Sequence, residues 1–260
     1  MVEKISTVRI IGLTGIPLVK AGDDLASIIL RVAEANNVKI EDGDVFVIAQ
    51  KAVSKAEDRL VELDKVKASP EALKIAEVSG RDQRLVELIL SESKRVLKAS
   101  QQTIIVEDKR GLVNINAGID KSNVEGQNRY ALLPTDPDRS ARRLRSRITR
   151  STGRNIGVII SDTYSRPFRR GQVNFAIGLA GLDPFFDYRG REDLFGYVMQ
   201  VKFNAVADEL ACAAELVMGQ GKEATPVVII KGFRRLTFNE GFSSKALLID
   251  ESEDLFKDVR

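Results

Sequence analysis

Residues 157–171 read Gly-Val-Ile-Ile-Ser-Asp-Thr-Tyr-Ser-Arg-Pro-Phe-Arg-Arg-Gly and change from apolar to polar within a few positions. The run from Gly157 to Ile160 predicts a short buried strand, after which come a carboxylate, Asp162, and a hydroxyl, Thr163. Arginines follow within eight residues of Asp162, and they offer paired donors to carboxylate or phosphate. This stretch therefore predicts a site that handles a metal and an anion together. The alternative is that Asp162 caps a turn and the arginines are solvated.

Two further apolar segments end in polar groups in the same way. The segment 8–13 predicts a strand, followed by a Gly-Ile-Pro loop at 15–17 and an amphipathic helix over 25–33. The segment 45–49 predicts a buried strand, and Lys51 and Lys55 after it lie one turn apart if that segment is helical. Both lysines could then face one phosphate group. The open alternatives are a plain turn for the loop and solvated side chains for the lysines.

The remaining periodic segments predict a mixture of helices and strands. Two helices are expected between residues 69 and 98, broken near 79–82, with Val96 and Leu97 on the apolar face. The other expected elements are an antiparallel pair at 103–106 and 112–115, a helix capped by Asp138 or Ser140 that runs to Arg150, a strand at 198–201, a helix at 204–218 and a strand at 226–232.

Composition restricts the class of protein. A chain of 260 residues with 43% hydrophobic and 30% charged residues is typical of a globular protein. No apolar run approaches the roughly 20 residues of a membrane span, and the N-terminus lacks the pattern of a signal peptide, so we expect a cytoplasmic protein without membrane contact. Cys212 is the single cysteine, which excludes an internal disulfide and favours a core position for this residue.

The absence of histidine restricts the chemistry further. With His 0, the chain has no Ser-His or Cys-His nucleophile pair and no histidine-bound zinc. Carboxylates, amides, hydroxyls, Lys and Arg remain, and these suit Mg²⁺ or Mn²⁺ and reactions such as phosphoryl transfer. A net charge of +3 does not indicate nucleic acid, and clustered basic residues favour a discrete anionic ligand.

Two other loops carry candidate ligands. Asp120 lies in a polar loop over 114–124, and Asp120 and Asp162 leave different strands, so the two carboxylates could converge on a divalent cation. The glycines on either side of Gln220 could be a simple helix C-cap, or they could let the loop wrap a nucleotide with Gln220 reaching a metal.

A rival interpretation is RNA binding by the basic helix that ends at Arg150, but no aromatic residues interleave with its arginines for base stacking. Those arginines are Arg139, Arg142, Arg143, Arg145 and Arg147. A rival enzyme class is a metal-dependent phosphohydrolase that uses the same carboxylates.

Six short motifs occur in order along nearly the whole chain. They are Gly-Ile-Pro-Leu at 15–18, Gln-Lys-Ala-Val-Ser-Lys at 50–55, Asn-Ala-Gly-Ile-Asp-Lys-Ser-Asn at 116–123, Ser-Asp-Thr at 161–163, Arg-Arg-Gly at 169–171 and Met-Gly-Gln-Gly at 218–221. Together they resemble the gamma-glutamyl ligase family of coenzyme F-420 biosynthesis. The sequence departs from the family pattern at Tyr164-Ser165, where a glycine often precedes the arginine.

The resemblance implies a GTP-dependent ligase that attaches L-glutamate to the lactyl carboxylate of a deazaflavin cofactor precursor and then adds a gamma-linked glutamate. It implies an acyl-phosphate intermediate, two Mg²⁺ or Mn²⁺ sites and K⁺. The implied fold is α+β, with two intertwined α+β subdomains spanning residues 1–260 in a homodimer.

The resemblance also implies roles for individual residues. Asp120 and Asp162 resemble the ligands of one metal and Thr163 and Gln220 those of a second, with Lys55 beside the reacting groups. Arg166, Arg169 and Arg170 are expected to orient the acidic substrates. The implied GTP-binding residues are Gly15, Ile16, Pro17, Leu18, Gln50, Lys51, Lys55, Asn123, Met218, Gly219, Gln220, Gly221, Lys222, Glu223, Ala224 and Thr225.

Overall fold

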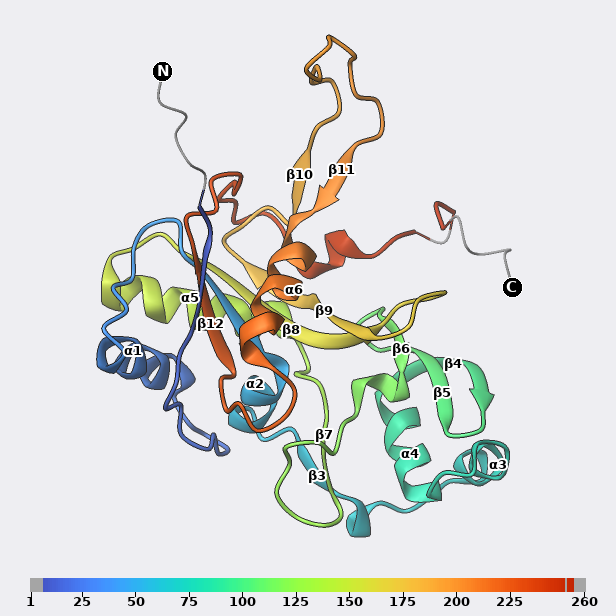
Figure 1. Cartoon of the computed structure of the whole chain (residues 1–260). Helices are drawn as coiled ribbons and strands as arrows, with labels where there is room; N and C mark the ends of the chain where they lie inside the picture. The colour runs from blue at the N-terminus through green and yellow to red at the C-terminus, as the bar shows by residue number, and fades with distance from the viewer. Residues whose placement is uncertain (1–6, 251, 255–260) are drawn as a thin grey trace.

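A five-stranded sheet forms the centre of the protein in a computed structural model that describes residues 7–250 and 252–254 (Figure 1). The strand order is β1-β12-β2-β8-β9. Only the β2–β8 pair is parallel among these neighbours, and the other pairs are antiparallel. The strands are β1 (Arg9–Gly12), β2 (Val45–Ala49), β8 (Gly157–Ser165), β9 (Gln172–Ala180) and β12 (Val227–Lys231).

Helices cover both faces of this sheet because its central strands are apolar on both sides. Phe46 and Ile48 of β2 face one core and Val45 and Val47 the other, as the period of two in a strand requires. The first core includes residues of α1 (Leu25–Ala35), α2 (Gln50–Ala56) and α5 (Pro137–Thr152). The second core is covered by α6 (Val206–Met218) and by the chain around η3 (Ser244–Leu247).

A smaller unit with its own apolar core lies between α2 and α5 in the sequence. Two helices pack there against an antiparallel three-stranded sheet of order β4-β5-β6. Its elements are α3 (Pro70–Ser79), α4 (Gln83–Glu92), β4 (Ser93–Ser100), β5 (Thr103–Asp108), β6 (Val113–Ile115), η1 (Leu63–Lys65) and η2 (Asn116–Gly118). A two-stranded sheet of β3 (Leu60–Glu62) and β7 (Arg129–Ala131) carries the chain into the unit and back.

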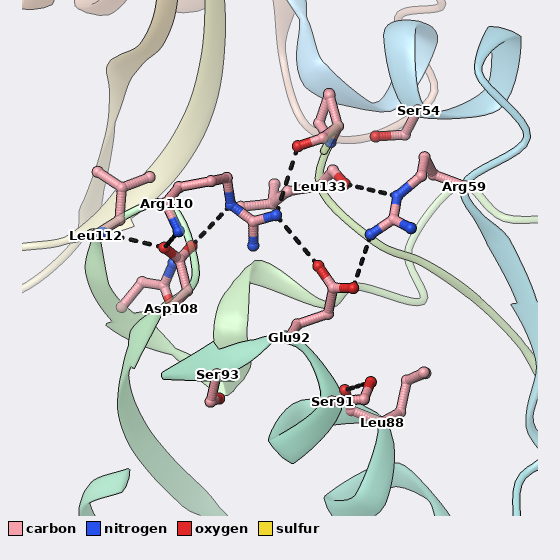
Figure 2. A network of polar contacts seen from close by, with 12 residues as sticks. Ser54, Arg59, Leu88, Ser91, Glu92, Ser93, Asp108, Arg110, Leu112 and Leu133 are labelled. Carbon is pink, nitrogen blue, oxygen red and sulfur yellow. Dashed lines mark hydrogen bonds and ion pairs between the residues drawn. The ribbon is translucent and has the colours of Figure 1, made fainter. Parts of the chain in front are cut away.

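A partly buried ionic network joins the small unit to the rest of the chain (Figure 2). Glu92 accepts from Arg59 at 2.8 Å and from Arg110 at 3.1 Å, and Arg110 also pairs with the fully buried Asp108 at 3.0 Å. Arg59 donates in addition to the carbonyl of Leu133 at 3.0 Å. Because one carboxylate holds two arginines from different parts of the chain, the network fixes the small unit against the segment that follows α2.

A long finger projects from the protein next to the start of α6 (Val206–Met218), the helix that follows it in the sequence (Figure 1). Strands β10 (Phe185–Asp187) and β11 (Phe203–Ala205) form its base. Near its tip Leu194 is 96% exposed and Phe195 is 95% exposed. Such large apolar side chains held in water mark a surface suited to contact with another molecule.

The predicted fold class, a mixed α+β protein, is confirmed by this architecture. The strands predicted at 8–13, 45–49, 103–106, 112–115 and 226–232 are present, as are the helices at 25–33 and 204–218. No helix in the described residues is both long enough and apolar enough to cross a membrane.

Four local predictions are wrong. Val96 and Leu97 lie in β4 rather than in a helix, because Ser93 ends α4 and the following residues pair with β5. Asp136 caps α5 by accepting from the amide of Arg139 at 2.8 Å. Asp138 instead lies inside that helix and accepts from the amides of Leu179 and Ser244 at 2.9 Å.

The other two corrections concern a strand that is absent and a strand that is longer than expected. Residues 198–201 form no strand, and Val198 makes only an isolated bridge with Glu192 within the finger. Strand β8 does not end at Ile160 but continues to Ser165, because β9 pairs with it beyond the point where β2 stops.

Candidate active site

The candidate site lies where the parallel strands β2 and β8 stop pairing. Their last paired residues are Ala49 and Ser161, after which the chain enters α2 on one side and the β8–β9 hairpin on the other. The carboxyl ends of parallel strands commonly carry ligand sites because the chains diverge there. A cavity of about 360 Å³ opens at this edge. Its lining includes Ile16, Pro17, Leu18, Gln50, Lys51, Lys55, Asn123, Asp162, Thr163 and all of residues 218–225.

Asp120 is not part of the cavity lining, but it pairs with Lys51, which is. Lys51 Nζ is 2.6 Å from Asp120 Oδ2, and Ser122 donates to the same carboxylate through its amide at 2.8 Å and its hydroxyl at 2.7 Å. Although burial raises the pKa of Asp120, hydrogen bonds from Lys51 and Ser122 outweigh it, so the pKa lies below its ordinary value. Asp120 is therefore a carboxylate already held in the ionised form.

The pKa of Asp162 is shifted in the opposite direction, above its ordinary value. Burial is the main cause that raises the pKa of Asp162 to about 6, and the nearby Asp120 carboxylate adds to the rise. The amide of Thr163 and the ammonium group of Lys51 act against it. A desolvated carboxylate next to a second carboxylate is stabilised by a nearby cation, since the cation offsets both the lost hydration and the repulsion.

Thr163 and Gln220 are joined through Asn174, which lines the cavity, and through Glu215, which does not. The Thr163 hydroxyl donates to Asn174 Oδ1 at 3.2 Å, and Asn174 Nδ2 donates to Glu215 Oε2 at 2.8 Å. Gln220 Nε2 donates to the other oxygen of Glu215 at 2.8 Å. Asn174 is only 3% exposed, so its partners decide its orientation.

Lys55 and Asn123 connect two walls of the cavity. Lys55 Nζ donates to the carbonyl of Asn123 at 2.7 Å, and Asn123 Nδ2 donates to the carbonyl of Gly221 at 3.2 Å. Burial, followed by the charge of Lys51, lowers the pKa of Lys55. Glu223 accepts from the amide of Gly221 at 2.7 Å and so closes the loop that follows α6. This loop curls because Gly219 and Ala224 adopt left-handed φ angles of 66° and 49°.

The oxygen donors of this site fit a hard divalent cation. Asp120 and Asp162 supply carboxylates, and the hydroxyl of Thr163 and the amide of Gln220 supply neutral oxygens, which is the donor set that Mg²⁺ and Mn²⁺ favour. Among the described residues no group of three or more Asp, Glu or Cys side chains has the arrangement of a metal site. A cation here would thus need ligands beyond these carboxylates, as a nucleotide phosphate could provide.

The arginines predicted to bind substrates do not line this cavity. Arg169 and Arg170 are exposed in the turn between β8 and β9, and Arg166 donates to the carbonyl of Arg170 at 3.1 Å. Figure 1 shows the hairpin, in yellow, reaching beyond the sheet toward β6. Strand β8 continues three residues past Asp162, which carries the arginines about 10 Å outward. Their substrate role remains a prediction.

Two arginines of the basic helix α5 contact segments outside the helix, and a third, Arg142, pairs with the capping residue Asp136 at 4.0 Å. Arg145 donates to the carbonyl of Ile156 at 2.7 Å and pairs with Glu240, and Arg147 pairs with Asp24. These arginines hold the helix to its neighbours, which weakens the RNA-binding alternative.

Gly15 does not line the cavity but lies directly before Ile16, with a left-handed φ of 87° that turns the loop toward it. Sequence patterns did not mark Ser161 and Asn174, which line the cavity, or Glu215, which lies behind it, as site residues. Cys212 was expected in the core but is only partly buried, and its thiol donates to the carbonyl of Asn174 at 3.1 Å.

Comparison with known proteins gives one consistent result. The family model described as F420-0:Gamma-glutamyl ligase matches residues 14–232. A coenzyme F420:L-glutamate ligase of Methanothermobacter thermautotrophicus is 45% identical, over 96% of this chain and 99% of the relative. Proteins of the same name from Methanopyrus kandleri and Archaeoglobus fulgidus are 44% and 42% identical, over 92% and 96% of this chain and 93% and 96% of their own lengths.

Proposed function

The chain belongs to the F420-0:gamma-glutamyl ligase family, and we propose on this premise that it joins L-glutamate to the carboxylate of a deazaflavin cofactor precursor at the expense of GTP. A second glutamate would follow through a gamma linkage. One observation supports the proposal: six separate segments of the chain line one cavity of about 360 Å³, and they include Ile16, Lys51, Asn123, Asp162, Asn174 and Gln220. That volume lies within the usual range for a small-molecule pocket.

The proposed reaction has two steps. The precursor carboxylate attacks the γ-phosphorus of GTP, the bond to the bridging oxygen breaks, and GDP leaves with that electron pair. The glutamate amine then attacks the carbon of the acyl phosphate, inorganic phosphate leaves, and the amine loses a proton. The chain needs no nucleophile of its own for either step, in keeping with its lack of histidine.

Each group at the site has a proposed part in this chemistry. Asp120 and Asp162 would hold one divalent cation and Thr163 with Gln220 a second, and these cations, when bound, neutralise phosphate charge. Lys51 and Lys55 supply further positive charge at the same wall. The loop 218–225 and the apolar segment 16–18 would enclose the nucleotide, which places the substrates for in-line transfer and keeps water out. K⁺ is a proposed accessory ion without an assigned ligand.

We also propose that the protein is a homodimer of intertwined α+β subdomains that acts in the cytoplasm. The exposed apolar residues of the finger support the dimer, since Leu194 and Phe195 near its tip are 96% and 95% exposed in the single chain. A second copy that covers this tip would remove the unfavourable contact with water.

The decisive assay supplies precursor, L-glutamate and GTP with Mg²⁺ and follows the products by mass spectrometry. The proposal requires that the precursor gain the mass of glutamate and that GDP and phosphate appear together with it. Phosphate release at the same rate with and without glutamate, and without a mass change in the precursor, would instead identify a phosphohydrolase.

A further inference from the structure

We propose that Asn174 and Glu215 are positioning residues that hold the oxygens of Thr163 and Gln220 toward the cavity, and so set the affinity of the second cation site. This inference rests on the proposed function, in which Thr163 and Gln220 are ligands there. Neither Asn174 nor Glu215 needs to touch the cation for this role. Both side-chain orientations are decided by which atoms can donate a hydrogen bond and which can only accept one.

Glu215 fixes the orientation of the Gln220 amide. A carboxylate only accepts hydrogen bonds, so the contact of 2.8 Å to Glu215 Oε1 must be made by the NH₂ end of Gln220. The oxygen end of the same amide then faces away from Glu215. Only that end can bind a cation, and Glu215 therefore selects the competent one of two orientations.

Asn174 fixes the Thr163 hydroxyl by the same logic. Its NH₂ group donates to Glu215 Oε2 at 2.8 Å, which leaves Oδ1 as the atom 3.2 Å from Thr163 Oγ1. An amide oxygen only accepts, so the hydroxyl must donate its proton to Asn174. The lone pairs of Oγ1 are then free on the cavity side. Thr163 and Asn174 are paired directly across strands β8 and β9, and this pairing fixes the distance between their side chains.

One carboxylate thus controls both predicted ligands, through its two separate oxygens. Hydrogen-bonded neighbours that orient metal ligands commonly change metal affinity about 10- to 100-fold when replaced. Asn174 is almost fully buried, so water is poorly placed to substitute for its contact with Glu215, whereas the contact between Glu215 and Gln220 is exposed.

Replacement of Glu215 by glutamine tests this logic with almost no change of volume. In the wild type the NH₂ groups of Asn174 and Gln220 each donate to one oxygen of Glu215. A glutamine at this position has a single oxygen and can accept from only one of them in this arrangement. One of the two amides must turn, and either turn presents a hydrogen to the second cation. We expect Glu215→Gln to weaken binding of Mn²⁺ in the presence of GDP at least tenfold, measured by electron paramagnetic resonance and calorimetry.

A double exchange provides the rescue. In Glu215→Gln combined with Gln220→Glu, the glutamine NH₂ at 215 donates to the carboxylate at 220, and its oxygen still accepts from Asn174. The carboxylate also keeps an oxygen for the cavity. We expect the double variant to recover Mn²⁺ affinity to within about threefold of the wild type, an outcome that a purely structural role for Glu215 does not produce.

Glu209→Gln is the matched control, because Glu209 lies exposed on the same helix and loses the same charge. GDP affinity in excess chelator and the thermal unfolding midpoint show whether each variant keeps an intact pocket. Wild-type protein that neither binds GDP with Mn²⁺ nor ligates glutamate would refute the proposed function. If wild type does both while Glu215→Gln keeps Mn²⁺ affinity within twofold, or the double variant binds no better than the single one, the positioning role is refuted alone.

Discussion

Lys51 Nζ lies 2.6 Å from Asp120 Oδ2, and its charge also lowers the pKa of Asp162. In the protein alone this ammonium group therefore offsets the repulsion between two carboxylates that approach one another at the cavity. A divalent cation placed between them would supply the same compensation with twice the charge. Lys51 would then be released toward the phosphates of a nucleotide.

Asp120→Asn and Asp162→Asn are each expected to abolish turnover while the fold is retained, because each removes a charge from the cation site and little packing volume. Steady-state assays at saturating Mg²⁺ and circular dichroism measure the two effects. Asp250→Asn, at an exposed position, is the control and should keep wild-type activity. Near-normal turnover in either site variant would contradict the assignment of the carboxylates.

Asp162→Asn should also stabilise the metal-free protein at neutral pH. The pKa of Asp162 in the folded protein is about 6, above the ordinary aspartate value of 3.8. The folded state therefore binds the proton more tightly, and the free energy of unfolding falls as the pH rises from about 4 to about 6. Asparagine carries no such penalty, so at pH 7 we expect a gain of about 1–3 kcal/mol in chelator. Chemical unfolding of the wild type and of Asp162→Asn at pH 4 and pH 7 measures this gain. If the two proteins differ in free energy of unfolding by the same amount at both pH values, ionisation of Asp162 is not the cause.

The hairpin arginines are expected to act on the acidic substrates and not on GTP. Arg169→Lys and Arg170→Lys keep the charge but lose paired donors, so kcat/KM for precursor or glutamate should fall at least about tenfold, near 1.4 kcal/mol. Kinetics with each substrate varied in turn provide the measurement, and Arg142→Lys on the exposed face of α5 is the control. Unchanged constants for all substrates in both variants would make these arginines surface charge.

Most strands of the large sheet, and the helices that cover it, were predictable because each is marked by a local pattern in the sequence. Segments such as 45–49 and 227–230 are continuous apolar runs that a polar residue follows. The extension of β8 to Ser165 was not predictable, since it depends on pairing with β9 and on the stacking of Tyr164 on Phe175 at 4.9 Å. The same holds for β4, whose strand form depends on pairing with β5.

In the candidate site, too, some residues were recognisable from the local sequence and others only from the tertiary structure. Asp120 and Asp162 were recognisable as carboxylates after apolar strands. Asn174 and Glu215 were not, because Asn174 acquires its position from the register opposite Thr163 and Glu215 from the packing of α6 on β9. A lone asparagine in a strand and a glutamate in a helix carry no signal of their own.

Loss of Glu92 should destabilise the protein through Arg110. In Glu92→Ala the Arg110 guanidinium, 11% exposed, keeps only Asp108 as a charged partner, and Arg59 loses its carboxylate. Removal of one partner from a buried ionic network costs about 3–5 kcal/mol. Urea unfolding provides the measurement. Glu62→Ala, which removes an exposed partner of Lys65, is the control and should have little effect, and equal losses in the two variants would argue against the network.

Cys212 should react slowly with thiol reagents while the protein is folded. Burial, and next the nearby Asp208 carboxylate, raise the pKa of Cys212, and its thiol donates to the carbonyl of Asn174. Since the thiolate is the reactive form, we expect modification at pH 8 at least about tenfold slower than for a free thiol, with full reactivity in urea. Absorbance with a chromogenic disulfide gives both rates, and a folded rate equal to the unfolded one would show that the thiol is freely accessible.

The finger is expected to hold two copies together. Leu194 and Phe195 are almost fully exposed in the single chain, so replacement of both by aspartate should leave the fold intact and repel a second copy through desolvated charge. Light scattering after gel filtration should give a dimer for the wild type and a monomer for the variant. Val78→Asp, at a site 59% exposed on the small unit, is the control and should remain dimeric. A variant that stays dimeric at the same concentration would exclude the finger tip from the interface, and a monomeric wild type would overturn the proposed dimer itself.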